Sequence, residues 1–127
     1  FIHGTAADKS SWRALVALLR ERVRATVYDR RGTAAWPIAD EDHSPSVHDH
    51  AEDAADVIRV LRGRPVHICA ASFGAVVALD LMKRRPDLVS SAVLFEPALS
   101  GDDRVSAVPR DLCDEVERLI GEGEPER

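Results

Sequence analysis

The sequence predicts an α/β fold, in which helices cover both faces of a parallel sheet. Short apolar runs of strand length alternate along the chain with longer amphipathic stretches. Strands that alternate with helices of this length form βαβ units, and such units build parallel sheets. The length of 127 residues is enough for one domain and too short for two. We therefore expect one α/β unit, with ligand-binding residues at the carboxyl ends of its strands.

Each predicted element follows from a local pattern. The helices place apolar residues at helical spacing, as Trp12, Leu15 and Leu19 show in the first of them. Asp8 or Ser10 is expected to cap this helix. The strands are short apolar or β-rich runs. In chain order, the sequence predicts a strand ending at 1–2, a helix over 10–23, a strand over 25–28, a loop over 30–45, a helix over 47–61 that Gly63 ends, a strand over 65–70, a helix over 73–83, a strand over 91–95 and a weaker helix over 111–120.

Composition excludes several classes of partner. The net charge of -5 and the absence of a basic stripe argue against a nucleic-acid or anionic-membrane partner. No apolar run approaches the roughly 18 residues of a membrane span. Cys69 and Cys113 have neither metal-ligand spacing nor a disulfide framework, which favours a reducing cytoplasm. No Gly-rich phosphate loop is present, which argues against a nucleotide-binding doubly wound domain. We also expect no cofactor and no metal. The sequence does not specify an oligomeric state.

The strongest chemical signal is the run Ala70-Ala71-Ser72-Phe73-Gly74. It follows a predicted strand and opens a predicted helix, which is the context of a nucleophile elbow. There a tight turn exposes a serine hydroxyl, and the residues two before and two after it, Ala70 and Gly74, must be small. The start of the helix adds a partial positive charge. The alternative is a serine that only caps the helix, with Gly74 for close packing.

Three blocks together resemble the α/β-hydrolase family. They are His3-Gly4 after an apolar strand, Asp29-Arg30-Arg31-Gly32 after the next strand, and the elbow at Ser72. Their spacing also fits, and the resemblance covers about residues 1–99. It implies an α/β-hydrolase core with a parallel sheet and helices on both faces.

We expect residues 1–127 to be a partial α/β-hydrolase domain, truncated at both ends. Phe1-Ile2 is typical of the end of a buried strand, whereas a domain seldom begins inside its core, and no histidine follows Ser72. The recognisable core is 1–99, and 100–127 would be the start of a cap or a tail.

The resemblance implies a role for each matching residue. The backbone N–H groups of Thr5 and Phe73 would form the oxyanion hole. His3 would be structural and would shape the oxyanion loop with Gly4. Residues 29–32 would shape their own loop. Ala34 stands where the family often has a second glycine, which puts the path of the following loop in doubt.

The triad acid and base are assigned less completely than the nucleophile. In a minority of the family the triad acid follows the strand after the elbow, and Glu96 occupies that place. The alternative is that Glu96 only lines the pocket at a strand end. The family order is serine, acid, histidine. All five histidines precede Ser72, so the chain offers no base at the expected place; they are His3, His43, His48, His50 and His67.

The remaining titratable residues are expected to be structural. His67 would pack inside the sheet, and Cys69 would be a buried packing residue. His43, His48 and His50 have spacings that suit a metal, but solvated residues near a helix start are the favoured interpretation.

The predicted function is a serine hydrolase that cleaves an ester, thioester or lactone of a small acyl substrate through an acyl-enzyme at Ser72. The chain alone is expected to be inactive. A non-catalytic hydrolase-like binding module is the first alternative. Cofactor-free haloperoxidase and acyltransferase chemistry are the others.

Overall fold

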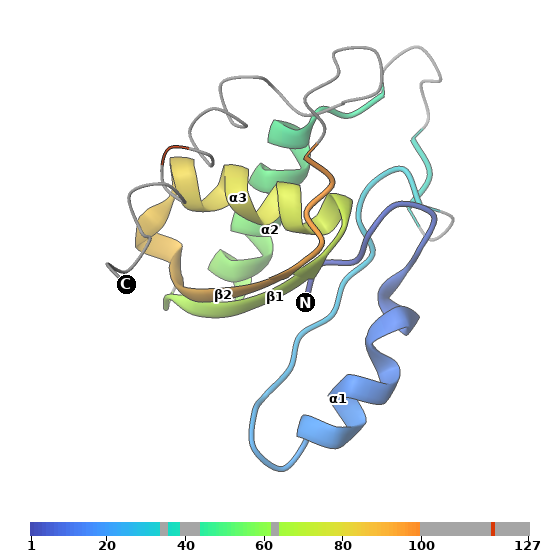
Figure 1. Cartoon of the computed structure of the whole chain (residues 1–127), viewed down its shortest axis with the longest axis vertical. Helices are drawn as coiled ribbons and strands as arrows, with labels where there is room; N and C mark the ends of the chain where they lie inside the picture. The colour runs from blue at the N-terminus through green and yellow to red at the C-terminus, as the bar shows by residue number, and fades with distance from the viewer. Residues whose placement is uncertain (34–35, 39–43, 62–63, 100–117, 119–127) are drawn as a thin grey trace, which may run out of the picture.

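A parallel βαβ unit lies at the centre of the computed structural model (Figure 1). The structure describes residues 1–33, 36–38, 44–61, 64–99 and 118. The elements in chain order are a 3₁₀ turn at Lys9–Trp12, α1 at Arg13–Leu19, α2 at Val47–Val60, β1 at Val66–Ala71, α3 at Phe73–Arg84, a 3₁₀ turn at Pro86–Leu88 and β2 at Val89–Phe95.

β1 pairs with two other segments of the chain, and both run parallel to it. Its register with β2 is regular from His67 opposite Ser91 to Ala71 opposite Phe95. On its other edge, Ile2 forms a parallel bridge with Ala70. The Ile2 N–H donates to the Cys69 carbonyl at 2.9 Å, and the Ala71 N–H donates to the Ile2 carbonyl at 3.3 Å. The strands predicted at 1–2, 65–70 and 91–95 therefore come together as one parallel arrangement.

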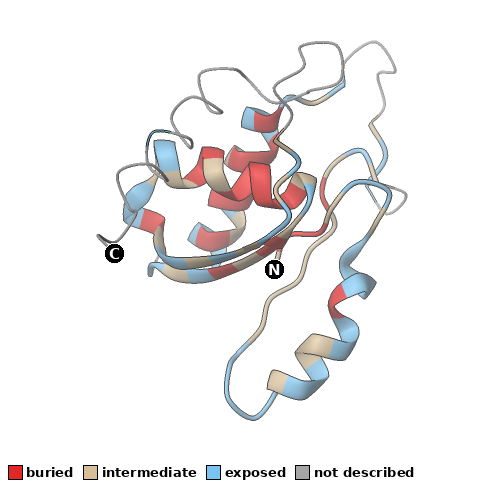
Figure 2. Ribbon diagram, in the orientation of Figure 1, coloured by how far each residue is buried: buried red, intermediate tan, exposed pale blue. Residues whose placement is uncertain are grey.

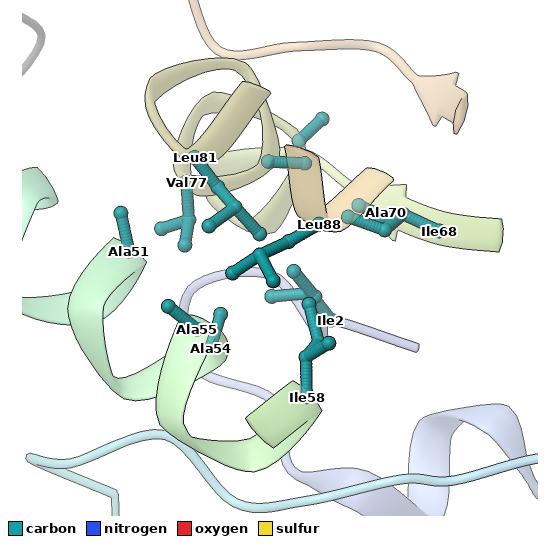
Figure 3. Close-up of a cluster of buried hydrophobic side chains, with 12 residues drawn as sticks. Ile2, Ala51, Ala54, Ala55, Ile58, Ile68, Ala70, Val77, Leu81 and Leu88 are labelled. Atoms are coloured by element: carbon teal, nitrogen blue, oxygen red, sulfur yellow. The ribbon is translucent and has the colours of Figure 1, made fainter. Parts of the chain in front are cut away.

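The core lies between β1 and the two helices α2 and α3. β1 alternates as a strand with one packed face must, so Ile68 and Ala70 are buried. They meet Leu81 of α3 and Ala55 of α2 in one cluster (Figure 3). In Figure 2 the buried positions gather on α2, α3 and β1. Helices α2 and α3 lie on one side of the strands, whereas α1 lies apart from them on the other (Figure 1).

A capping box defines the start of α2. The Asp49 N–H donates to the Ser46 hydroxyl oxygen at 3.2 Å, and the Ser46 N–H donates to Asp49 Oδ2 at 2.8 Å. Both bonds satisfy donors that a helix start leaves free. They place the first turn of α2 at Val47, as the sequence predicts. None of the described helices is long and apolar enough to cross a bilayer.

The N-terminal elements are shorter than predicted. The helix expected over 10–23 begins as a 3₁₀ turn that Asp8 caps, and it ends at Leu19. The Leu19 carbonyl then accepts the N–H groups of residues 22 and 23, which closes a turn. Because α1 buries none of its residues, packing contributes little to extending it.

The strand expected over 25–28 is not formed. Residues 23–30 are extended without strand pairing. A strand requires a repeated ladder with a neighbour, and the backbone of residues 25–28 makes one hydrogen bond to the described residues, in which the Phe1 amino group donates to the Thr26 carbonyl at 2.9 Å. The predictions for Gly63, Ala34, Cys113 and, apart from Arg118, the helix at 111–120 lie outside the described residues.

Candidate active site

Ser72 occupies the junction between β1 and α3 in a rare backbone conformation. Its φ is 52° and its ψ is -125°, a region that residues with a side chain seldom adopt. The Ser72 N–H donates to the Phe95 carbonyl at 2.8 Å, and the Ser72 carbonyl accepts the Ala75 N–H at 2.9 Å. The residue thus makes a bond to β2 and the first helical bond of α3. This tight turn leaves Ser72 exposed.

Gly74 has no room for a side chain. A β-carbon at this position would lie 2.5 Å from the carbonyl oxygens of both Ile2 and His3. The first turn of α3 therefore packs directly on the backbone of the segment that bridges β1. Ala70, two residues before the serine, is fully buried. The requirement for small residues on both sides of Ser72 has a visible cause at Gly74.

The turn after His3 lies against the serine. A β-carbon on Gly4 would sit 3.1 Å from the Ser72 β-carbon and 3.7 Å from its hydroxyl oxygen. Thr5 follows in an exposed turn, and Ala6 has a positive φ of 52°. Residues far apart in the sequence, Gly4 and Ser72, are thus neighbours at the carboxyl edge of the sheet. Thr5 is the next residue along this turn.

His3 is buried, and both of its ring nitrogens have partners. Nε2 accepts the Arg30 N–H at 3.1 Å, so this nitrogen carries no proton. In the neutral ring the proton is then on Nδ1, which donates to the Gly4 carbonyl at 2.9 Å. Burial lowers the pKa of His3, the bond to Gly4 opposes this, and the nearby Arg30 lowers the pKa further. A ring held in this way has no free nitrogen for proton transfer.

Arg30 connects the separate pieces of the site. Its side chain is buried, with the residue 6% exposed. Nε donates to the His3 carbonyl at 3.0 Å, and Nη2 donates to the Gly4 carbonyl at 2.8 Å. The guanidinium carbon lies 4.9 Å from the centre of the Phe73 ring. The sequence assigned residues 29–32 to shaping a loop and did not predict these contacts.

The rest of that loop is tied to other parts of the chain. Both carboxylate oxygens of Asp29 bind Lys9, one through its N–H at 2.9 Å and one through Nζ at 2.6 Å. The contact with Lys9 holds the pKa of Asp29 below its usual value. Arg31 forms a two-bond ion pair with Asp53 of α2. These contacts anchor the loop on both sides of Arg30.

Glu96 lies at the same edge of the sheet as Ser72. Ala71 and Phe95 are register partners, and Ser72 and Glu96 are the residues directly after them. Neighbouring strands are about 4.8 Å apart, so the two residues leave the sheet side by side. Glu96 is exposed and has a positive φ of 44°. The structure therefore brings the predicted acid to the edge that carries the serine.

Two histidines and one cysteine lie differently from the predictions. His50, expected to be solvated, is buried because it falls on the packed face of α2 with Ala54. His67, expected to pack inside the sheet, is exposed on the outer face of β1, where its Nδ1 lies 2.8 Å from the Ser91 hydroxyl. Cys69 on that face is half-buried rather than buried. The described residues leave this face of the sheet uncovered.

The histidines of α2 have separate partners. His48 Nδ1 lies 3.6 Å from Asp80 Oδ2 on α3. The His50 ring meets the Phe73 ring edge-on, with 5.4 Å between centres. His43 lies outside the described residues. Within the part of the chain that the structure describes, no three His, Cys, Asp or Glu side chains are grouped to hold a metal ion.

A large hollow of about 990 Å³ lies away from this edge. Its lining includes Val66, Ile68 and Cys69 of β1 together with Ile58 of α2, and neither Ser72 nor Glu96 belongs to it. The candidate site is therefore the open carboxyl edge around Ser72.

Comparison with known proteins gives the same assignment. The model of the Alpha/beta hydrolase family matches residues 1–123. The chain belongs to this family. The uncharacterized hydrolase YraK of Bacillus subtilis is 29% identical over 98 residues, which make up 77% of this chain and 36% of that protein. Esterase Rv0045c of Mycobacterium tuberculosis is 27% identical over 124 residues, which make up 98% of this chain and 41% of the esterase.

A solved structure of this hydrolase fold also resembles the chain. Rv0554 of Mycobacterium tuberculosis has a TM-score of 0.69 and 30% sequence identity, covering 100% of this chain and 44% of that one. The predicted fold class, the α/β-hydrolase fold, is thus confirmed. The chain spans less than half the length of these relatives.

Proposed function

We propose that this chain carries the nucleophile and the oxyanion hole of a serine hydrolase that cleaves an ester, thioester or lactone bond. The observation that carries the proposal is the strained backbone of Ser72 at the β1–α3 junction, with the Gly4 turn against its hydroxyl. A cap serine needs no such conformation, because helix caps ordinarily have extended backbones. Names of relatives, hydrolase and esterase, support the same class of reaction.

In the proposed reaction the Ser72 hydroxyl oxygen attacks the carbonyl carbon of the substrate. The hydroxyl proton passes to a general base, and the carbonyl oxygen becomes an oxyanion. Collapse of the tetrahedral intermediate breaks the bond from the carbonyl carbon to the leaving oxygen or sulfur, which takes the proton from the base. An alcohol or thiol then departs, whereas the hydroxyl of an opened lactone stays on the acyl group. Water then attacks the acyl-serine and gives a proton to the base, which returns it to the Ser72 oxygen as the carboxylic acid is released.

The N–H groups of Thr5 and Phe73 are the proposed oxyanion donors. Phe73 is the first residue of α3, and the first N–H groups of a helix have no partner within it. Thr5 follows Gly4, which lies against Ser72. Two preorganised donors of this kind stabilise the charge that develops on the carbonyl oxygen. His3 supports the hole from its buried position and takes no part in proton transfer.

Glu96 is the proposed triad acid, from its place beside Ser72 at the ends of paired strands. Its exposed carboxylate would orient a histidine and stabilise the imidazolium. The alternative is a carboxylate that lines the pocket while another residue is the acid. The histidine base is not among residues 73–127, which contain none. We therefore propose that residues 1–127 by themselves do not catalyse the turnover of substrate.

A binding module without catalysis is the rival function, and the missing base is its support. The two differ in whether Ser72 becomes acylated. Haloperoxidase and acyltransferase chemistry would use the same serine, so they are separated by their products.

Covalent labelling tests the proposal directly. The complete gene product is treated with a fluorophosphonate, and the modified residue is located by mass spectrometry. We expect the label on Ser72, and we expect Ser72→Ala to lose both the label and the hydrolysis of p-nitrophenyl acetate. Ser91→Ala is the matched control, because Ser91 has a histidine partner but a regular strand backbone. Labelling that persists in Ser72→Ala contradicts the proposal.

A further inference from the structure

We infer that Arg30 is a positioning residue that sets both halves of the oxyanion hole at once. The inference rests on the proposed function of Ser72. One buried guanidinium touches the turn that leads to Thr5 and the ring of Phe73, the two residues whose N–H groups would bind the oxyanion. Nothing in the Asp29–Gly32 pattern predicts this, because a charged residue after a strand is ordinarily solvated.

The Thr5 half of the oxyanion hole depends on the geometry of one peptide group. The Gly4 carbonyl and the Thr5 N–H belong to the same planar peptide and point in opposite directions. Arg30 Nη2 donates to the Gly4 oxygen at 2.8 Å, and His3 Nδ1 donates to the same oxygen at 2.9 Å. Two donors on the carbonyl therefore fix the direction of the Thr5 N–H. A cation on the oxygen also polarises the peptide, which makes its N–H a stronger donor.

A further bond secures the preceding peptide. Arg30 Nε donates to the His3 carbonyl at 3.0 Å, so the planar guanidinium spans two successive carbonyls of the turn. The Arg30 N–H in turn donates to His3 Nε2 at 3.1 Å. Lysine has no planar fork of donors and would not reproduce this pattern.

The Phe73 half of the oxyanion hole depends on the contacts of the Phe73 side chain. Arg30 lies over the face of its ring, at 4.9 Å from the centre, and His50 meets the ring edge-on at 5.4 Å. A cation over an aromatic face is attracted by the ring, more strongly when both are desolvated. The ring is therefore held between two elements, and this holds the first residue of α3 in place. The N–H of Phe73 is at that residue.

The partners of the Arg30 guanidinium in these contacts are neutral. Its charge faces two carbonyl oxygens and a ring, whereas the charge of neighbouring Arg31 is paired with Asp53. A buried charge in a low dielectric acts over a longer range than a solvated one. Arg30 thus also adds positive potential near the position where the oxyanion develops. Burial lowers the pKa of Arg30, but an arginine remains charged at neutral pH.

The test compares Arg30→Met, Arg30→Lys and Arg59→Met in the complete gene product, using p-nitrophenyl acetate. Loss of one oxyanion donor lowers kcat by about 100-fold or more, so a misdirected donor in Arg30→Met is expected to cost at least about tenfold in kcat. KM is expected to change little, because the donors act on the transition state. Arg30→Lys should be intermediate. Arg59→Met removes an exposed arginine of α2 that pairs with Asp56 of the same helix, and its kcat should stay at the wild-type value.

Crystal structures of wild type and Arg30→Met separate this inference from the proposed function. We expect the Gly4–Thr5 peptide to rotate or the Phe73 ring to shift in the variant. An unmoved peptide and ring, or a kcat equal to that of Arg59→Met, overturns the inference. If Ser72→Ala keeps full hydrolysis, the proposed function fails, while the two structures still decide whether Arg30 positions these groups. If Arg30→Met does not fold, Arg30→Lys is measured by the same two criteria.

Discussion

Gly74 lies so close to Ile2 that a β-carbon on residue 74 would sit 2.5 Å from the Ile2 carbonyl oxygen. The start of α3 and the segment bridging β1 are thus in backbone contact directly behind Ser72. This contact requires a residue without a side chain, and it ties the serine turn to a distant part of the sequence.

Replacing the two glycines of the site should separate stability from activity. Gly74→Ala has to push backbone apart, so we expect it to lower the free energy of unfolding by about 1–3 kcal/mol. Gly4→Ala places its methyl group 3.1 Å from the Ser72 β-carbon, a milder contact at the side chain of the proposed nucleophile. Gly4→Ala should lower the free energy of unfolding less than Gly74→Ala does, and it should lower the rate of ester hydrolysis more. Urea unfolding and ester hydrolysis of both variants check this; equal stability losses would contradict it.

Ser72→Gly should stabilise the protein while removing its proposed nucleophile. A φ of 52° is strained for serine and accessible to glycine. Relief of such strain is worth about 1–3 kcal/mol. Ser72→Ala keeps the β-carbon and is the control, since it should remain as strained as the wild type. Urea midpoints of the three proteins give the answer, and identical midpoints for the glycine and alanine variants would exclude backbone strain at this turn.

Acid should weaken the fold through His50. Burial, together with the nearby Arg30, lowers the pKa of His50 to about 4. In the unfolded chain a histidine has a pKa near 6.5, so below that pH the unfolded state binds a proton that the folded state does not. Stability contributed by the neutral ring is therefore present above about pH 6.5 and is lost as the pH falls toward 4.

The measurement is urea unfolding of the complete gene product between pH 4 and 8. His50→Leu should flatten the dependence on pH in the acid range. His67→Leu is the matched control, because it removes an exposed histidine and leaves His50 in place. A wild-type slope that His50→Leu leaves unchanged would rule out His50 as its source.

Residues 1–127 by themselves should hydrolyse p-nitrophenyl esters no faster than their Ser72→Ala variant. The reason is that no histidine follows Ser72, and His3 has both ring nitrogens engaged. Steady-state rates of the two purified chains, with circular dichroism to establish that both are folded, test this. Turnover that depends on Ser72 would show that a base lies within these residues.

Much of the central fold could be predicted because its signals are local. The elbow run predicts the β1–α3 junction to within a residue, and apolar spacing predicts α2. The extent of α1 and the strand at 25–28 could not be obtained in this way, since they depend on what packs beside them. The end of α1 at Leu19 reflects a helix that buries no residue.

The residues of the candidate site also differ in whether a local sequence pattern could predict them. Ser72, Gly74 and Gly4 follow from motifs whose steric reasons are visible in the structure. The role of Arg30 could not be predicted from a motif. Its partners are backbone carbonyls on a distant segment, and every residue has a carbonyl whatever its side chain. His50 had a usable signal, since it falls within the buried period of Val47 and Ala54.

The bridge between Ile2 and Ala70 has a consequence for how the proposed nucleophile acquires its backbone conformation. The strain at Ser72 persists only while surrounding contacts hold it, and several of these come from the first four residues. A chain that has formed β1, α3 and β2 but has not yet docked its N-terminal segment can relax the serine turn. We therefore expect the strained turn at Ser72 to form only when this segment docks, so that partly folded molecules lack the backbone geometry of the proposed nucleophile.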